Sequence, residues 1–205
     1  MTREYCYQCR RAKVACLCGR IEKQPNNISV IVLQHPDEVS NPKGSAIIAE
    51  LGLELYQHWV GEDFSQHQDL QQLVADYSDE IAVLYPAENA EALEQSWLQN
   101  RKKGISQLIV IDATWRKAKK IWELTPALHD LAVIKLSQDK ISNYRIRKVP
   151  KDGYLSTVEC IVEGLRLLES RPDAYQPLLG LFDEMIDFQI GKMGGALYRK
   201  NYLDK

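Results

Sequence analysis

The sequence predicts an α/β fold, with a mostly parallel sheet flanked by helices, plus a small N-terminal zinc module. Two patterns indicate this: apolar strand-like runs alternate with helical patterns along most of the chain, and four cysteines gather near its start. A length of 205 residues suits one domain with a small appendage. We expect the module in residues 1–25, the main domain in 26–190 and a flexible tail in 191–205.

Four short apolar runs are predicted strands. They are rich in β-branched residues and show no polar alternation, which is typical of strands buried on both faces of a sheet. They cover residues 28–34, 81–86, 107–113 and 131–137.

Helical patterns separate these strands. Those between strands cover residues 46–59, 66–77, 89–103 and 115–124, and two more follow at 155–170 and 173–190. Gly52 is a weak point in the first of them. The polar, basic segment 137–154 is a long loop, and loops of that length in compact domains are usually functional or disordered.

Charge is segregated along the chain. Residues 44–100 hold eleven acidic residues and no Lys or Arg, so all 26 basic residues lie outside this segment. A solvated surface explains most charge runs, but segregation on this scale favours a side that faces a polyanion. No run is long enough to span a bilayer and no secretory leader is evident, so we expect a cytoplasmic protein.

The cysteine cluster has the spacing of a metal site. Cys6, Cys9, Cys16 and Cys18 form two close pairs, and four thiolates bind zinc tetrahedrally. Such a set leaves no open position, so the zinc is expected to be structural and to supply the folding energy of a module with little core. Arg10, Arg11 and Lys13 in this module suit RNA contact, with a solvated basic surface as the alternative.

Asp112 ends an apolar strand and is followed by Thr114, Trp115 and a basic helix start. Ligands of open α/β sheets bind beyond the carboxyl ends of strands, and a partly desolvated carboxylate there suits a general base. Thr114 is a candidate helix cap and Trp115 a candidate pocket wall. The alternatives are a capping role for Asp112 and ordinary core packing for Trp115.

The segment that follows the long loop offers further anion-binding groups. Arg145 and Arg147 alternate with an apolar residue, which suits binding of a carboxylate or phosphate. Ser156 and Glu159 have the spacing of a capping box, a sufficient structural explanation for both. His35, after the first strand, is more consistent with a hydrogen-bonded structural residue than with a ligand.

Six blocks in this order resemble the DTW-domain family: the paired cysteines, "HPDE", "LYP", "DATW", "YRIRK" and "LSTVE". The namesake residues fall on Asp112, Thr114 and Trp115. The resemblance implies transfer of the 3-amino-3-carboxypropyl group of S-adenosylmethionine to N3 of a uridine in tRNA, with methylthioadenosine released. Similar bacterial members act at uridine 47. It also implies a SPOUT-like domain with a C-terminal trefoil knot, which the strand and helix pattern does not predict.

The resemblance gives the residues provisional roles. Asp112 is the expected base, and Arg145 or Arg147 is expected to hold the donor carboxylate. The expected donor-binding residues are Leu84, Tyr85, Pro86, Ile111, Thr114, Trp115, Arg145, Arg147, Leu155, Ser156, Thr157 and Glu159. The expected RNA-binding residues are Arg10, Arg11, Lys13, Arg116, Lys117, Lys119 and Lys120.

Three other functions remain open at this point. A SPOUT-like RNA methyltransferase would use the same donor and release S-adenosylhomocysteine. A non-catalytic zinc-containing RNA-binding module would bind RNA without consuming the donor. A small-molecule transferase would turn over without RNA, which the basic segregation disfavours. Neither a membrane nor an obligate protein partner is expected.

Overall fold

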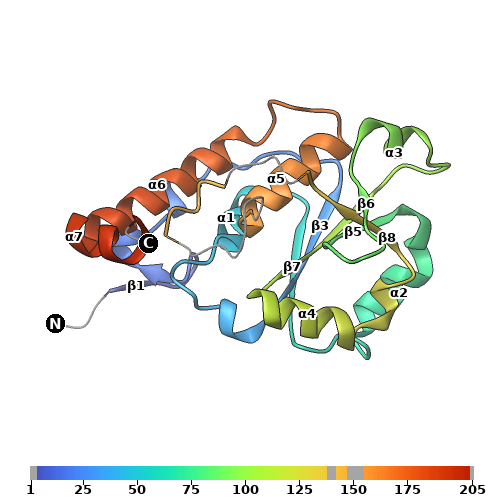
Figure 1. The fold of residues 1–205 in the computed structure, drawn as a ribbon, viewed down its shortest axis with the longest axis horizontal. Helices are drawn as coiled ribbons and strands as arrows, with labels where there is room; N and C mark the ends of the chain where they lie inside the picture. The colour runs from blue at the N-terminus through green and yellow to red at the C-terminus, as the bar shows by residue number, and fades with distance from the viewer. Residues whose placement is uncertain (1–3, 138–141, 147–154, 204–205) are drawn as a thin grey trace.

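The computed structural model describes residues 4–137, 142–146 and 155–203. Its centre is a six-stranded, fully parallel sheet in the order β4-β3-β7-β5-β8-β6 (Figure 1). The strands are β3 (Ser29–Gln34), β4 (Tyr56–Val60), β5 (Ile81–Leu84), β6 (Glu91–Ala92), β7 (Gln107–Asp112) and β8 (Ala132–Lys135). The α/β class and the four predicted strands are confirmed.

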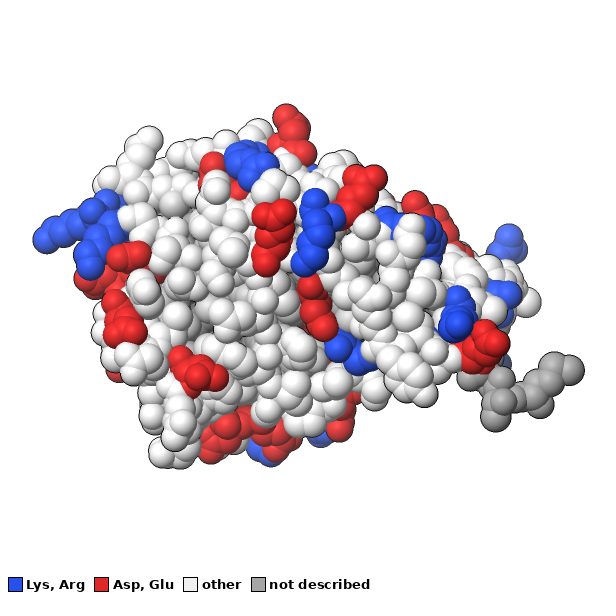
Figure 2. All heavy atoms as spheres, turned by 180° about the vertical axis from the view of Figure 1, so that it is seen from behind, with Lys and Arg blue, Asp and Glu red and all other residues white. Residues whose placement is uncertain are grey.

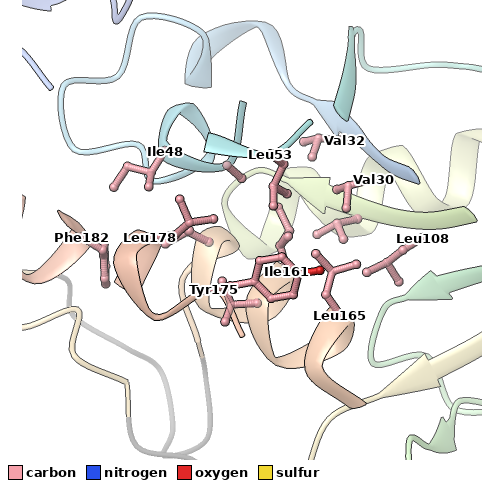
Figure 3. Close-up of a cluster of buried hydrophobic side chains, with 14 of the residues drawn as sticks. Val30, Val32, Ile48, Leu53, Leu108, Ile161, Leu165, Tyr175, Leu178 and Phe182 are labelled. Carbon is pink, nitrogen blue, oxygen red and sulfur yellow. The ribbon is translucent and has the colours of Figure 1, made fainter. Parts of the chain in front are cut away.

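Helices cover both faces of this sheet. They are α1 (Ala46–Gly52), α2 (Gln68–Tyr77), α3 (Gln95–Gln99), α4 (Trp115–Leu124), α5 (Thr157–Leu168), α6 (Gln176–Met193) and α7 (Gly195–Tyr198). Side chains alternate along β3: Val30 and Val32 pack with α1, α5 and α6, whereas Ile31 and Leu33 pack with α2 and α4. Figure 3 shows the first of these two cores, in which Val30 lies toward Ile161 and Leu165, and Leu178 lies beside Ile48.

Two predicted helices are wrong in part. The pattern over 46–59 divides at Gly52, where α1 ends and the chain continues into edge strand β4. A Cβ at Gly52 would lie 2.3 Å from Leu178 Cδ2, so this position is packed against α6. The segment 89–103 forms β6 and the short α3, because it pairs with the open edge of β8. Tertiary pairing outweighs the local helical pattern in both places.

The C-terminal segment is helical where the sequence predicts a loose tail. Helix α6 runs to Met193, and Gly194, with φ of 82°, lets the chain turn into α7 and the π-helical segment Arg199–Leu203. The last segment packs back onto the domain, since Lys43 Nζ donates to Tyr202 Oη at 3.2 Å.

The cysteine-rich module is a two-stranded antiparallel hairpin, β1 (Tyr5–Cys6) and β2 (Arg11–Ala12), followed by two 3₁₀ turns. Ion pairs join it to the main domain, from Arg10 to Glu50 of α1 and from Arg20 to Glu184 of α6. The module is thus packed against the same helices that cover one face of the sheet. Over the described ranges, no helix combines the length and apolar character needed to cross a membrane.

Candidate active site

A cavity of about 360 Å³ opens beyond the carboxyl ends of β3 and β7. The helices that follow these two strands, α1 and α4, pack in different cores on opposite faces of the sheet. A crevice forms where connections diverge in this way, and it is the usual ligand site of open α/β sheets. Its walls include Glu38, Lys43, Asp112, Thr114, Tyr144, Thr157 and Tyr202.

Asp112 is the carboxylate at the centre of this site. It ends β7 directly opposite Gln34 of β3, and it is only 7% exposed. Gln34 Nε2 donates to Asp112 Oδ2 at 2.8 Å, and Thr157 Oγ1 donates to Asp112 Oδ1 at 2.5 Å. One donor on each oxygen fixes the orientation of the carboxylate toward the cavity.

Sequence reasoning missed the role of Gln34. Its Oε1 atom is buried and has no hydrogen-bond partner within the described ranges, so this amide is held chiefly by Asp112. Its position at the end of a predicted strand could have indicated this role, because the carboxyl ends of adjacent parallel strands lie at the same edge of a sheet, and Asp112 also ends a strand.

The N-terminus of α5 completes the site. The predicted capping box is confirmed: Ser156 Oγ accepts the Glu159 N–H at 3.4 Å, and Glu159 Oε2 accepts the Ser156 N–H at 2.7 Å. Glu159 also accepts hydrogen bonds from Ser142 Oγ and the Asn143 N–H. Ser156 and Glu159 therefore fix the backbone, and Thr157 between them reaches the cavity.

Thr114 and Trp115 occupy different positions. Thr114 is at the N-cap of α4 but makes no capping hydrogen bond with its side chain, which instead lines the cavity. Trp115 follows it, is 39% exposed and is not part of the lining that the described residues form. Ile111 packs with the α2 and α4 core.

The "LYP" residues lie one strand further along the sheet. Leu84 is buried in the α1, α5 and α6 core, while Tyr85 stacks on Trp122 with ring centroids 4.7 Å apart. Burial raises the pKa of Tyr85. Neither these two residues nor Pro86 nor Leu155 is among the described residues that line the cavity.

Of the two predicted arginines, Arg145 pairs with Asp187 of α6 at 2.8 Å and is outside the cavity lining. Arg147 lies outside the described residues. Within the described part of the cavity wall, the cation is Lys43. This residue was not predicted from the sequence as part of the site.

The cations of α4 lie beside the site and mostly form ion pairs. Lys117 Nζ is 2.5 Å from Asp37, Lys120 Nζ 2.7 Å from Glu62 and Lys119 Nζ 3.6 Å from Glu123. Arg116 is exposed. Lys117 lowers the pKa of Asp37 through a hydrogen bond.

His35 has the structural role that the sequence favoured. It is 4% exposed, its Nδ1 accepts the Asp37 N–H at 3.1 Å, and its Nε2 lies 2.6 Å from Glu62.

The four cysteine sulfurs have the geometry of a metal site. All lie within 4.8 Å of one another, and the Cys6–Cys18 and Cys9–Cys16 sulfur pairs are each 3.7 Å apart. A tetrahedral zinc ion with sulfurs at about 2.3 Å requires sulfur–sulfur distances of roughly 3.8 Å. A backbone hydrogen bond from Cys9 lowers the pKa of Cys6 to about 6, which favours the thiolate that a metal needs, whereas burial raises the pKa of Cys9 and that of Cys18. The set therefore fits a metal ion.

Two basic residues of the cysteine-rich module, Arg10 and Arg11, form contacts within the protein. Arg11 is 5% exposed, and its Nη1 and Nη2 donate to the carbonyls of Pro42 at 2.6 Å and Gly44 at 2.7 Å. Its predicted role as a surface RNA contact is wrong, since the guanidinium is buried. Arg10 pairs with Glu50, and Lys13 remains exposed.

One broad face of the molecule carries both signs of charge. Figure 2 shows acidic and basic side chains interleaved across one face, several of them near its middle, with no continuous basic patch on this face. The segregation of charge along the chain is therefore not preserved on this surface.

Comparison with known proteins gives a consistent result. A model of the DTW domain matches residues 3–190. A Drosophila melanogaster protein named tRNA-uridine aminocarboxypropyltransferase 2 is 34% identical over 210 residues, covering 99% of this chain and 82% of that protein. Proteins of the same name from Mus musculus and Macaca fascicularis are each 28% identical and cover 98% and 92% of this chain, and the matches span 68% and 64% of those proteins. No solved structure matches.

Proposed function

Since the chain belongs to the DTW-domain family, we propose that it transfers a 3-amino-3-carboxypropyl group from S-adenosylmethionine to N3 of a uridine in tRNA. The observation that carries the proposal is the cavity that contains Asp112, Thr114 and Thr157 at the carboxyl ends of β3 and β7. Relatives that match nearly the whole chain bear the name of this activity.

The cavity fits a donor of this size and polarity. Its volume of about 360 Å³ lies in the range of small-molecule sites. Tyr144 and Ile146 supply apolar wall, while Glu38, Lys43 and Asp112 supply charge of both signs. A sulfonium-containing amino acid needs both kinds of surface.

Asp112 is the proposed base. When bound, the donor supplies an electrophilic Cγ: the N3–Cγ bond forms as the Cγ–S bond breaks, and methylthioadenosine leaves. Asp112 takes the N3 proton of uridine, which must be lost for N3 to attack carbon. Gln34 and Thr157 hold the carboxylate in place, so its positioning supplies much of the rate.

The other proposed donor contacts divide into residues that line the cavity and residues that do not. Thr114 and Thr157 are the proposed side-chain contacts. Ile111, Leu84, Tyr85, Pro86 and Leu155 are proposed to act through the backbone around the strand ends, and Trp115 at the rim. Ser156 and Glu159 act indirectly, by fixing the start of α5.

The tRNA is proposed to contact α4 beside the site. Arg116, Lys119 and Lys120 are exposed there, with Lys117 partly so, and phosphate contacts of this kind position a nucleic acid without reading its sequence. Lys13 is a more remote candidate. By resemblance we extend the proposal to uridine 47 and to a SPOUT-like knot. The proposed knot involves the segment 137–154, of which 138–141 and 147–154 lie outside the described residues.

The metal is proposed to be structural zinc held by Cys6, Cys9, Cys16 and Cys18. It would fix the hairpin from which Arg11 reaches the carbonyls of Pro42 and Gly44. Gly44 lines the cavity, so the zinc module supports the site without taking part in the chemistry.

The nucleoside that is released tests the proposal. Purified protein is incubated with S-adenosylmethionine and unmodified tRNA, with a second reaction lacking tRNA. Methylthioadenosine that forms only with tRNA is the expected result. S-adenosylhomocysteine would indicate a methyltransferase, and methylthioadenosine without tRNA a small-molecule transferase. RNA binding with neither nucleoside released would indicate a binding module.

A further inference from the structure

We propose that Lys43 and Glu38 bind the amino-acid end of the donor, Lys43 its α-carboxylate and Glu38 its α-ammonium group. This inference rests on the proposed function and names the groups that hold its substrate. Both side chains belong to the loop between β3 and α1, and both line the cavity that contains Asp112.

Lys43 contacts a neutral side chain, whereas other cations near the site are paired with carboxylates. Its Nζ donates to the neutral hydroxyl of Tyr202 at 3.2 Å and lies 5.9 Å from the centre of that ring. Lys117, Lys120 and Arg145 are each already paired with a carboxylate. Among the described residues, no carboxylate forms an ion pair with Lys43, so its charge is available to a ligand in the cavity.

The loop that carries Lys43 is held from several directions. Tyr144 Oη donates to the Lys43 carbonyl at 2.5 Å, and the Lys43 N–H donates to Asn41 Oδ1 at 3.0 Å. Arg11 binds the carbonyls on both sides of Lys43, those of Pro42 and Gly44. A cation on a backbone fixed in this way is pre-positioned, which lowers the entropic cost of binding.

Glu38 is held on the same loop with the opposite charge. Its Oε2 accepts from Asn41 Nδ2 at 2.7 Å, and Asn41 is the residue that also binds the Lys43 N–H. Asn41 therefore links the Glu38 carboxylate to the backbone of Lys43. A cation and an anion on one short loop complement an amino-acid group, which carries one charge of each sign.

The charge of the cavity favours this ligand over an RNA phosphate. Glu38 and Asp112 together outweigh Lys43, and the donor, with its sulfonium, carries a net positive charge. A phosphate would instead be repelled by both carboxylates. Lys43 is thus assigned to the donor, and the exposed cations of α4 to the tRNA.

Equilibrium binding without RNA tests the assignment on the full-length, zinc-loaded protein. The ligands are S-adenosylmethionine, its decarboxylated form and methylthioadenosine, which lacks the amino-acid end. Lys43→Met should weaken S-adenosylmethionine binding about tenfold and leave methylthioadenosine binding unchanged, because one charge-assisted hydrogen bond is lost. The decarboxylated donor should bind the wild type and Lys43→Met equally. Glu38→Gln should also weaken the donor selectively.

Two controls separate binding from folding. Lys43→Arg keeps the charge and should stay within about threefold of the wild type. Lys103→Met removes an exposed lysine that pairs with Asp79, away from the cavity, and should change nothing.

Unchanged donor affinity in Lys43→Met would overturn the assignment while leaving the proposed function intact. So would an equal loss of methylthioadenosine binding, which indicates a distorted cavity, or a loss confined to tRNA binding. A wild-type protein that binds neither S-adenosylmethionine nor methylthioadenosine would instead overturn the proposed function, and the assignment with it.

Discussion

Replacing Arg11 with Met tests whether the cysteine-rich module supports the cavity loop. Arg11 is 5% exposed and donates to the carbonyls of Pro42 and Gly44. Hydrogen bonds from a charged donor contribute about 1.5–3 kcal/mol each, but burying the guanidinium offsets part of this. The same burial lowers the pKa of Arg11. Methionine keeps the length and leaves the Gly44 carbonyl without this donor.

We expect Arg11→Met to lower the free energy of unfolding by about 2–3 kcal/mol, which is roughly 4–12 °C in Tm for a chain of this size. Urea and thermal unfolding of the zinc-loaded protein measure this. Arg20→Met is the matched control, because its ion pair with Glu184 is exposed and should contribute about 0.5 kcal/mol or less. If both variants unfold alike, Arg11 does not support the loop.

Three other outcomes are expected. Thr157→Val removes the hydroxyl that donates to Asp112 and should slow uridine modification at saturating donor about tenfold, whereas Thr157→Ser should be nearly normal; equal rates in both would contradict this role. Gly52→Ala places a Cβ 2.3 Å from Leu178 and should cost about 1–3 kcal/mol in urea unfolding, whereas Gly180→Ala meets open space in α6 and should be neutral or stabilising. Cys9→Ser should lower zinc content by elemental analysis and also lower Tm; an unchanged Tm would count against a structural metal.

The sheet was predictable because its strands are continuous apolar runs, and such runs are recognisable without knowledge of their partners. β3 and β7 needed only their own residues to be found. Edge strand β4 could not be predicted from its own residues, because its sequence is half polar and it forms a strand only by pairing with β3. The same applies to β6 at the other edge.

The site was predictable only at its centre. Asp112 could be placed at a strand end, and Ser156 with Glu159 at a helix start, because each depends on local sequence. The hydrogen bond between Asp112 and Thr157 joins residues 45 positions apart and follows from packing alone. Lys43 and Tyr202 are more distant still, and local sequence carries no signal that the C-terminal segment returns to the cavity.

The central claim is that Asp112 removes the N3 proton of uridine in this cavity, and the Asp112→Asn variant tests it most directly. Asparagine is nearly isosteric and keeps one acceptor oxygen, while its Nδ2 can donate to the unpartnered Oε1 of Gln34 once that amide turns over, so donor affinity should stay close to that of the wild type. Mass spectrometry of tRNA nucleosides after a single turnover measures the aminocarboxypropyl gain on uridine. We predict a rate at least about a hundredfold lower in Asp112→Asn, as expected for loss of a general base. A rate within a few fold of the wild type, with the donor still bound, would contradict the account.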